Sequence, residues 1–236
     1  MSGREFVRLG GLVELLEEHG LTIRGGFNRA EDEQLPANAA PNPAESVLLI
    51  GNAGDGFWPR FVAWLDGQPA DLENPLDTWS RHVLDKAAEA FGARVIMPND
   101  KPYAPFQQWA MRAVGLRPSP LGILMHPSFG LWHAYRGALL FDRKIAAEDL
   151  GKPARMPIHL CDLCIEKPCL NSCPVGAFGK LFDSGACYSH IASAGGHSCI
   201  EGGCLARNAC PHDKFRYRDA LQAFLMASFR TALHPR

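Results

Sequence analysis

The spacing of hydrophobic and polar residues predicts helices and strands that alternate over much of the chain. Leu9, Val13 and Leu16 recur at helical spacing. Gly20 follows them as a stop signal, so the first helix is expected over residues 5–18. Further helices are expected at 57–65, 76–91, 105–113 and 217–230, and strands at 21–24, 46–50, 94–97, 121–126 and 132–141.

This alternation predicts an α+β or α/β layer for residues 1–150. Only a short turn, Pro127-Ser128-Phe129-Gly130, separates the strands at 121–126 and 132–141. We therefore expect these two strands to form an antiparallel hairpin inside the sheet. Residues 31–45 are expected to form a surface linker and residues 151–157 a hinge. The amphipathic helix at 217–230 is expected to pack back on the body of the protein.

Composition narrows the class of protein. The 236 residues are 47% hydrophobic and 21% charged, which is typical of a globular protein with a real core. A net charge of −1 argues against a nucleic-acid partner. The sequence shows no apolar run close to the roughly 20 residues that a membrane span needs, and no signal-peptide core. We therefore expect a soluble, cytoplasmic protein.

All eight cysteines fall between residues 161 and 210. Disulfides stabilise small secreted domains with poor cores, whereas this chain is neither small nor recognisably secreted. Thiols gathered so locally in a reducing compartment indicate metal ligands.

The cysteine spacing resembles that of ferredoxin cluster motifs. The first half reads Cys161-x2-Cys164-x4-Cys169-x3-Cys173-Pro174, and the second half has Cys187 and then Cys199-x4-Cys204-x5-Cys210-Pro211. In ferredoxins with two clusters, the cysteine before proline binds the cluster of the other motif. This rule predicts two 4Fe–4S clusters. The first would be held by Cys161, Cys164, Cys169 and Cys210, and the second by Cys173, Cys187, Cys199 and Cys204.

Two other metal sites are compatible with these residues. A single cluster would leave four cysteines spare, and the irregular second half favours this alternative. A structural zinc site also uses four thiolates, with histidines as further candidates. The histidines close to the cysteines are His159, His190, His197 and His212. Zinc, however, leaves the two Cys-Pro endings unexplained.

The segment 121–140, LGILMHPSFGLWHAYRGALL, resembles the signature of the CblC-type cobalamin-processing family. That family has a similar His-Pro-x-Phe-Gly, then Trp, then Ala-x-Arg-Gly and an apolar run. The resemblance covers about residues 45–141 and includes Pro75-Leu76-Asp77 at the start of a helix. It implies a cofactor-binding domain at residues 1–150.

The cysteine region, at about residues 158–215, is similar to that of epoxyqueuosine reductase, a cobalamin-dependent enzyme with two clusters. The order of cysteines is the same, and Cys187-Tyr188-Ser189 matches its isolated cysteine. This implies a ferredoxin-like iron–sulfur module at residues 151–236. Both families resemble the nitroreductase and flavin-reductase group, which implies a mixed sheet with flanking helices and a fold that often forms homodimers.

Together the resemblances imply a reductase in which clusters pass electrons to cobalamin or a similar corrinoid, with flavin as a less favoured cofactor. The alternative is a ferredoxin-like electron-transfer protein without an organic cofactor. Either function needs a redox donor or acceptor protein as a partner. The expected cofactor-binding residues are His126, Phe129, Gly130, Trp132, Tyr135 and Arg136.

His126 has two interpretations. It is either a cobalt ligand or proton donor, or a side chain that caps the turn before Pro127, and we favour the cap. Arg136 is expected to pair with an amide, carboxylate or phosphate of a ligand, or with a structural partner.

Overall fold

The computed structural model describes residues 9–31, 33, 35–36, 43–151 and 157–233. Its chain divides into two compact units. The first unit consists of Met1–Gly115 and Ala134–Pro157, and the second of Leu116–His133 and Ile158–Arg236. Every cysteine belongs to the second unit, which also includes most of the CblC-like signature segment.

The first unit is built around a four-stranded sheet with the strand order β1-β2-β6-β3. β1 pairs antiparallel with β2, and β3 pairs antiparallel with β6. β2 is almost entirely buried, as its continuous apolar run predicts. The strands are β1 (Thr22–Asn28), β2 (Ser46–Ala53), β3 (Arg94–Ile96) and β6 (His133–Phe141).

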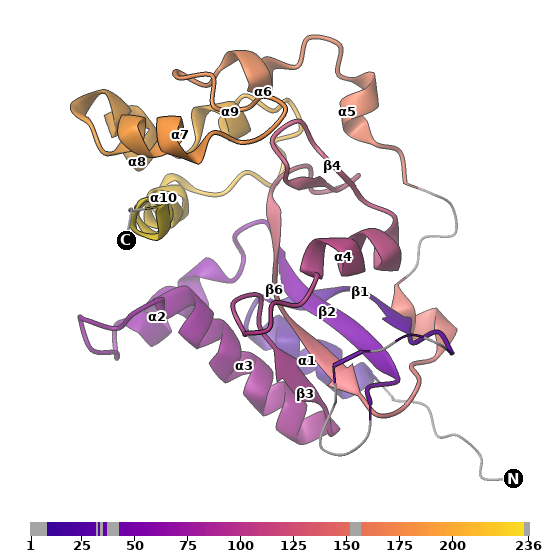
Figure 1. The fold of residues 1–236 in the computed structure, drawn as a ribbon. Helices are drawn as coiled ribbons and strands as arrows, with labels where there is room; N and C mark the ends of the chain where they lie inside the picture. Colours follow the sequence, from indigo (N-terminus) through magenta and orange to yellow (C-terminus); the bar gives the residue numbers. More distant parts are fainter. Residues whose placement is uncertain (1–8, 32, 34, 37–42, 152–156, 234–236) are drawn as a thin grey trace, which may run out of the picture. The chain divides into compact units, whose positions relative to one another are not determined.

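Helices pack on this sheet and on each other (Figure 1). α4 packs on β1, and α1 packs on both β1 and α3. Side chains of Phe57, Phe61 and Trp79 meet in the core, with ring centroids 5.8 Å apart for both contacts of Trp79. The helices are α1 (Gly10–Glu18), α2 (Trp58–Leu65), α3 (Pro75–Phe91), α4 (Phe106–Val114) and the 3-10 turn η1 (Ala147–Leu150).

Most elements predicted for the first unit are confirmed with small shifts at their ends. α3 begins at Pro75, because proline suits the first turn of a helix, and ends before Gly92 in a left-handed conformation. β1 extends further than expected, to Asn28. The first part of the predicted helix 5–18 lies outside the described residues, as do parts of the predicted linkers 31–45 and 151–157.

The second unit has less regular structure. Its two strands, β4 (Arg117–Pro118) and β5 (Leu124–Met125), form a separate two-stranded sheet. Its longest helix, α10, packs on α7 and α8. The helices are α5 (Leu160–Leu163), α6 (Pro168–Asn171), α7 (Ser184–Ile191), η2 (Ala194–Gly196), α8 (His197–Gly202), α9 (Leu205–Asn208) and α10 (Asp219–Leu233).

The predicted hairpin of strands 121–126 and 132–141 is wrong. β5 pairs with β4, whereas β6 pairs inside the four-stranded sheet. Only an isolated bridge between His126 and Gly130 closes the turn between them. The apolar run was misleading because Met125 and Leu131 are buried against cysteines of the second unit and not in the sheet.

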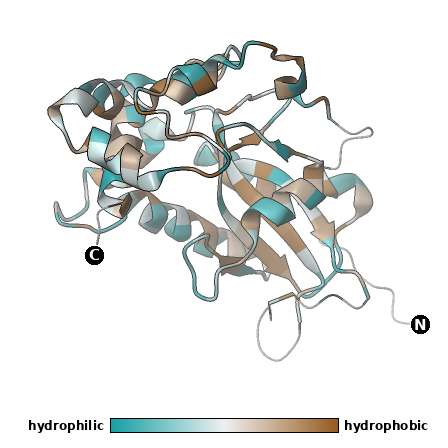
Figure 2. Ribbon diagram, turned by 45° about the horizontal axis from the view of Figure 1, so that its top comes forward, coloured by the Kyte–Doolittle hydropathy of each residue, from teal (hydrophilic) through white to brown (hydrophobic). Residues whose placement is uncertain are grey.

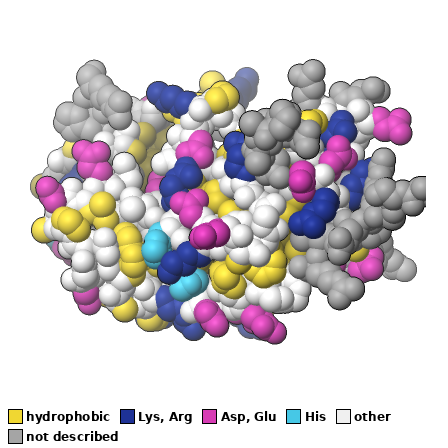
Figure 3. Space-filling view, turned by 90° about the horizontal axis from the view of Figure 1, so that it is seen from below, with side chains coloured by type: hydrophobic (Ala, Val, Ile, Leu, Met, Phe, Trp, Pro, Cys, Tyr) yellow, Lys and Arg dark blue, Asp and Glu magenta, His cyan; other side chains and the backbone are white. Residues whose placement is uncertain are grey.

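Apolar and charged residues are distributed as expected of a globular protein. Hydrophobic residues gather on the strands of the sheet in Figure 2. The face shown in Figure 3 carries acidic and basic side chains side by side, in agreement with the small net charge. Among the described residues, no helix combines the length and apolar character needed to cross a membrane.

Candidate metal centres

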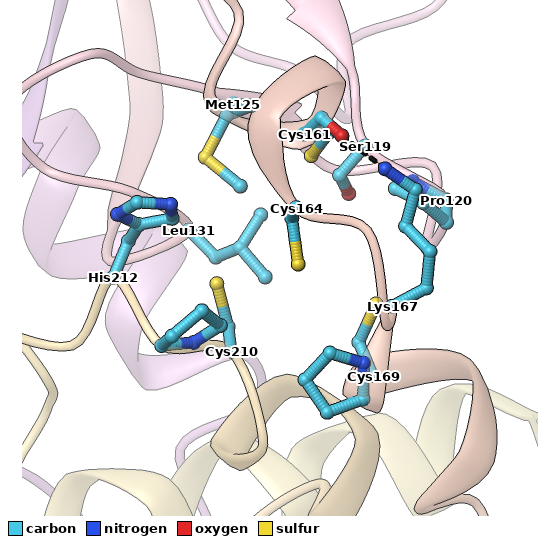
Figure 4. Close-up of a pocket in the computed structure, with 12 residues that line it drawn as sticks. Ser119, Pro120, Met125, Leu131, Cys161, Cys164, Lys167, Cys169, Cys210 and His212 are labelled. Carbon is cyan, nitrogen blue, oxygen red and sulfur yellow. Dashed lines mark hydrogen bonds between the residues drawn. The ribbon is translucent and has the colours of Figure 1, made fainter.

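The four cysteines predicted for the first cluster line one pocket in the second unit. Their side chains come from α5, α6 and the segments that follow α5 and α9, and Figure 4 shows their sulfur atoms around a common space. The pocket has about 310 Å³ of space between atoms, including a part open to solvent. Its other lining residues are Ser119, Pro120, Met125, Leu131, Lys167, Pro168, Pro211 and His212.

These thiols are close enough to influence one another. Burial, and then the neighbouring Cys210 thiol, raises the pKa of Cys161 to about 11. Burial and the adjacent Cys164 raise the pKa of Cys169 above its usual value. Four thiolates cannot share a buried pocket unless cations compensate their charge, and bound metal ions supply that compensation. The pocket therefore favours neutral thiols when empty and metal-bound thiolates when filled.

The other four cysteines form a second set. Burial raises the pKa of Cys187 to about 11, and the thiols that add to this effect are Cys204, Cys173 and Cys199. The pKa of Cys204 is also raised by burial, and Cys199 and Cys173 contribute again. Cys161, Cys164, Cys169 and Cys210 thus line one pocket, and the other four cysteines influence one another. The division of the eight into two cluster ligand sets stays a prediction.

Backbone N–H groups point at several of the sulfur atoms. The N–H of Ala177 donates to Cys173 Sγ at 3.3 Å. The N–H groups of Arg207 and Ala206 lower the pKa of Cys204 against the larger effect of burial. The N–H of His212 acts in the same direction on Cys210. Such donors stabilise thiolates and are among the features that set the potential of iron–sulfur clusters.

Within the described part of the chain, no three His, Cys, Asp or Glu side chains are placed to hold one metal ion. The binding of clusters by these cysteines stays a prediction. All eight cysteines are free thiols. Of the candidate zinc-binding histidines, His197 pairs with Glu201 at 3.0 Å, while His212 lines the first pocket.

Sequence reasoning missed the contribution of the signature segment to this pocket. Gly130 lies directly on the backbone of His212, and a Cβ there would come within 2.4 Å of the His212 carbonyl oxygen. Its left-handed φ of 58° also favours glycine. Met125 and Leu131 form an apolar wall beside the cysteines. The Phe-Gly pair after Pro127 could have indicated a tight turn, but not the surface on which that turn packs.

The His126 ring caps its own turn. Its Nδ1 accepts hydrogen bonds from the N–H groups of Ser128 at 3.0 Å and Phe129 at 3.2 Å. The ring also stacks on that of Phe129, with centroids 4.3 Å apart. Because Nδ1 is an acceptor, the neutral ring carries its proton on Nε2. In this tautomer, Nε2 can donate a hydrogen bond but has no free lone pair with which to bind a metal ion.

The Trp132 side chain is fully buried, and it contacts the Arg207 guanidinium and the Tyr217 ring. The Arg207 guanidinium lies 4.6 Å from its ring centroid and 4.8 Å from that of Tyr217. Arg207 also donates to the Leu131 carbonyl oxygen. These contacts give Trp132 a packing role in the second unit.

The two remaining cofactor candidates lie in the first unit. The Arg136 Nε donates to Asn52 Oδ1 at 2.9 Å, and its guanidinium lies 5.0 Å from the centre of the Phe57 ring. Burial raises the pKa of Tyr135 to about 12. The assignment of His126, Phe129, Gly130, Trp132, Tyr135 and Arg136 to a cofactor stays a prediction.

Comparisons with known proteins support the fold. No family model matches the sequence, and no curated protein matches it either. Among solved structures, the chain is similar to the B12-trafficking protein CblC of C. elegans, which is described as a homologue of human MMACHC. The TM-score is 0.53 at 13% sequence identity, over 93% of this chain and 92% of that one. The chain therefore has a CblC-like α+β fold.

Proposed function

We propose that this chain is an iron–sulfur redox protein that holds two 4Fe–4S clusters and delivers their electrons to a corrinoid. The observation that supports the iron–sulfur part is the pocket lined by Cys161, Cys164, Cys169 and Cys210, together with the mutual influence of the other four thiols. We assign one cluster to each set of four. Each set takes its fourth member from the other half of the motif, as in ferredoxins with two clusters. When bound, such clusters supply one-electron transfer.

The chain's own residues hold and shield these groups. Thiolates bind the iron atoms, and backbone N–H groups such as those of Ala177 and Arg207 stabilise the sulfur charge. Met125 and Leu131 exclude water from one side of the first pocket. A dry, hydrogen-bonded surrounding is what the protein contributes to the potential of a cluster.

The first experiment is anaerobic purification followed by iron and sulfide analysis. Two clusters correspond to about eight iron atoms and about eight sulfides per chain. About four iron atoms and about four sulfides per chain would support the single-cluster alternative. Zinc without sulfide would overturn the iron–sulfur proposal.

Three double variants test how the cysteines divide between the sets. Replacing both Cys161 and Cys210 by alanine should remove about half of the iron, because these residues belong to one set. Replacing both Cys187 and Cys199 should remove the other half. The crossed pair Cys161 and Cys187 should remove nearly all of it. Equal losses in all three variants would contradict the division.

The corrinoid part rests on the CblC-like fold and on the signature motif at 121–140. The solved neighbour is a B12-trafficking protein, and clusters in this chain would replace an external electron donor. The test is to add cobalamin or flavin to the reduced, iron-loaded protein and follow absorbance anaerobically. We expect micromolar binding and reduction of cobalamin, with weaker binding of flavin. If neither binds, the corrinoid part fails while the iron–sulfur part stands.

Electron transfer without an organic cofactor is the second candidate. It is favoured by the packing of Gly130 on His212 and by the burial of Trp132, which give structural roles to residues expected in a cofactor pocket. A chain that contains iron, takes up electrons and binds no cobalamin would support it. The cytoplasmic location, a redox partner protein, homodimer formation and the lack of a nucleic-acid partner all stay predictions.

A further inference from the structure

The expanded gap between Cys164 and Cys169 places a lysine at the first pocket. Lys167 adopts a left-handed conformation, with φ 45°, immediately before α6. This is uncommon for a residue with a side chain. The turn directs its ammonium group to the Cys161 carbonyl oxygen, to which it donates a hydrogen bond (Figure 4). The side chain lines the pocket and is half-buried.

The positive charge of Lys167 acts on the cysteines of the first set. It favours the thiolate form of Cys161 and of Cys169, against the larger effect of burial. The nearby Asp162 forms an ion pair with Arg117, so its charge is compensated. Asp213 follows Cys210 by three residues, and its carboxylate disfavours the thiolate of Cys210. Lys167 is thus a cation that lines the first pocket, and Asp213 is an opposing anion.

Net charge near a cluster is one of the factors that set its potential, since reduction adds negative charge. Lys167 lines the pocket of the first set and carries a positive charge there. A cluster in this pocket should therefore be easier to reduce with Lys167 than without it.

We propose that Lys167 is a positioning residue that makes the first cluster, the one of Cys161, Cys164, Cys169 and Cys210, easier to reduce. This inference rests on the proposed clusters and names a residue that tunes one of them. The Cys161 carbonyl oxygen holds the ammonium group, and the side chain lines the pocket, so its charge stabilises the charge that reduction adds. Asp213 carries the opposite charge, and its removal should have the opposite effect.

The test is a reductive titration of the full iron-loaded chain, followed by electron paramagnetic resonance. The signals are assigned with the two double-alanine variants that each keep one cluster. In Lys167→Gln, the ratio of reduced to oxidised first cluster at a fixed potential should fall by up to about tenfold, equivalent to about 59 mV for one electron. Asp213→Asn should raise the same ratio. The second cluster should change little in either variant.

Three controls separate this effect from simpler ones. Lys167→Arg keeps the charge and should keep most of the potential, whereas Lys167→Gly keeps the left-handed backbone and should behave like Lys167→Gln. Lys180→Gln removes an exposed lysine elsewhere in the module and should have little effect. Unchanged potentials in Lys167→Gln with full iron content would overturn the inference. A chain without iron would instead overturn the proposed function.

Discussion

The two compact units differ in what stabilises them. In the first unit, the largest fully buried side chains are aromatic and aliphatic, among them Phe61, Trp79 and Ile50. In the second unit, cysteines occupy core positions. The buried cluster there consists of Leu121, Met125, Leu131, Cys161, Cys169, Ala206 and Cys210. The first unit thus has a conventional apolar core, whereas thiols make up part of the core of the second.

Helix length shows the same contrast. α3 in the first unit has 17 residues and buries seven of them. α5, α6 and α9 in the second unit have four residues each. Helices this short are not stable alone, because the first turn loses the conformational entropy of several residues and gains only one hydrogen bond. The proposed clusters, which would join these short helices, would supply that stability.

Removal of iron should give the largest difference in stability between the two units. With iron chelated under reducing conditions, amide exchange in residues 158–210 should become at least about a hundredfold faster, equivalent to about 2.7 kcal/mol. Amides of β2 should stay protected, because β2 belongs to the apolar core. Hydrogen exchange resolved by peptide is the measurement. Equal loss of protection in both units would contradict the proposed difference.

A substitution in the core of the first unit should instead destabilise that unit and leave the iron content unchanged. Gly51 lies against the Ala134 backbone, and a Cβ there would come within 1.9 Å of the Ala134 carbonyl oxygen. Gly51→Ala should lower the free energy of unfolding of the first unit by about 3 kcal/mol. The measurement is thermal unfolding followed by tryptophan fluorescence.

Gly56→Ala is the matched control, since nothing lies within 4 Å of a Cβ at that position. It should have a small effect on unfolding. Iron content per folded chain should be normal in both variants. A stable Gly51→Ala protein would show that β2 and β6 can separate at this point.

The stacking of Arg207 offers a smaller test within the second unit. Its planar guanidinium contacts the rings of Trp132 and Tyr217. Arg207→Lys keeps the charge but loses the planar contact, and should cost about 1 kcal/mol. Denaturant unfolding of the iron-loaded chain measures this, with the exposed Arg216→Lys as control. Equal stability of the two variants would mean that the stacking contributes nothing.

The smallest expected effect concerns pH and the first unit. Burial raises the pKa of Asp77, against the opposing effect of Arg136. The folded state therefore holds this proton more tightly than the unfolded state. The free energy of unfolding should fall as pH rises from about 4 through the folded pKa. Asp77→Asn removes this slope, and denaturant unfolding of both proteins at several pH values measures the difference. Parallel curves would contradict the shift.

Sequence patterns predicted the first unit well because its elements follow simple periodicity. The spacing around Phe61 and Trp79 is helical, and both residues are buried as that spacing requires. The hairpin at 121–141 failed for a physical reason. An apolar run shows that a segment is buried, but not which surface covers it.

The candidate site was predictable in part. Cysteine spacing predicted that Cys161, Cys164, Cys169 and Cys210 would lie together, and these four line one pocket. The cluster assignment of all eight stays a prediction. Lys167 could not be found this way, since its role depends on a left-handed turn that the sequence does not signal. The same is true of Gly130, whose neighbour His212 is distant along the chain.

The crossing of the cysteine sets has a consequence for biosynthesis. The second set runs from Cys173 to Cys204, so it lies wholly within the span of the first, from Cys161 to Cys210. On a ribosome, the inner set is complete before the outer one. If the proposed clusters form, the early thiols of the outer set must stay reduced until the last one has been made. A cell that supplies iron and sulfide late would then fill both sets in one folding event, and one that supplies them early would fill the inner set first.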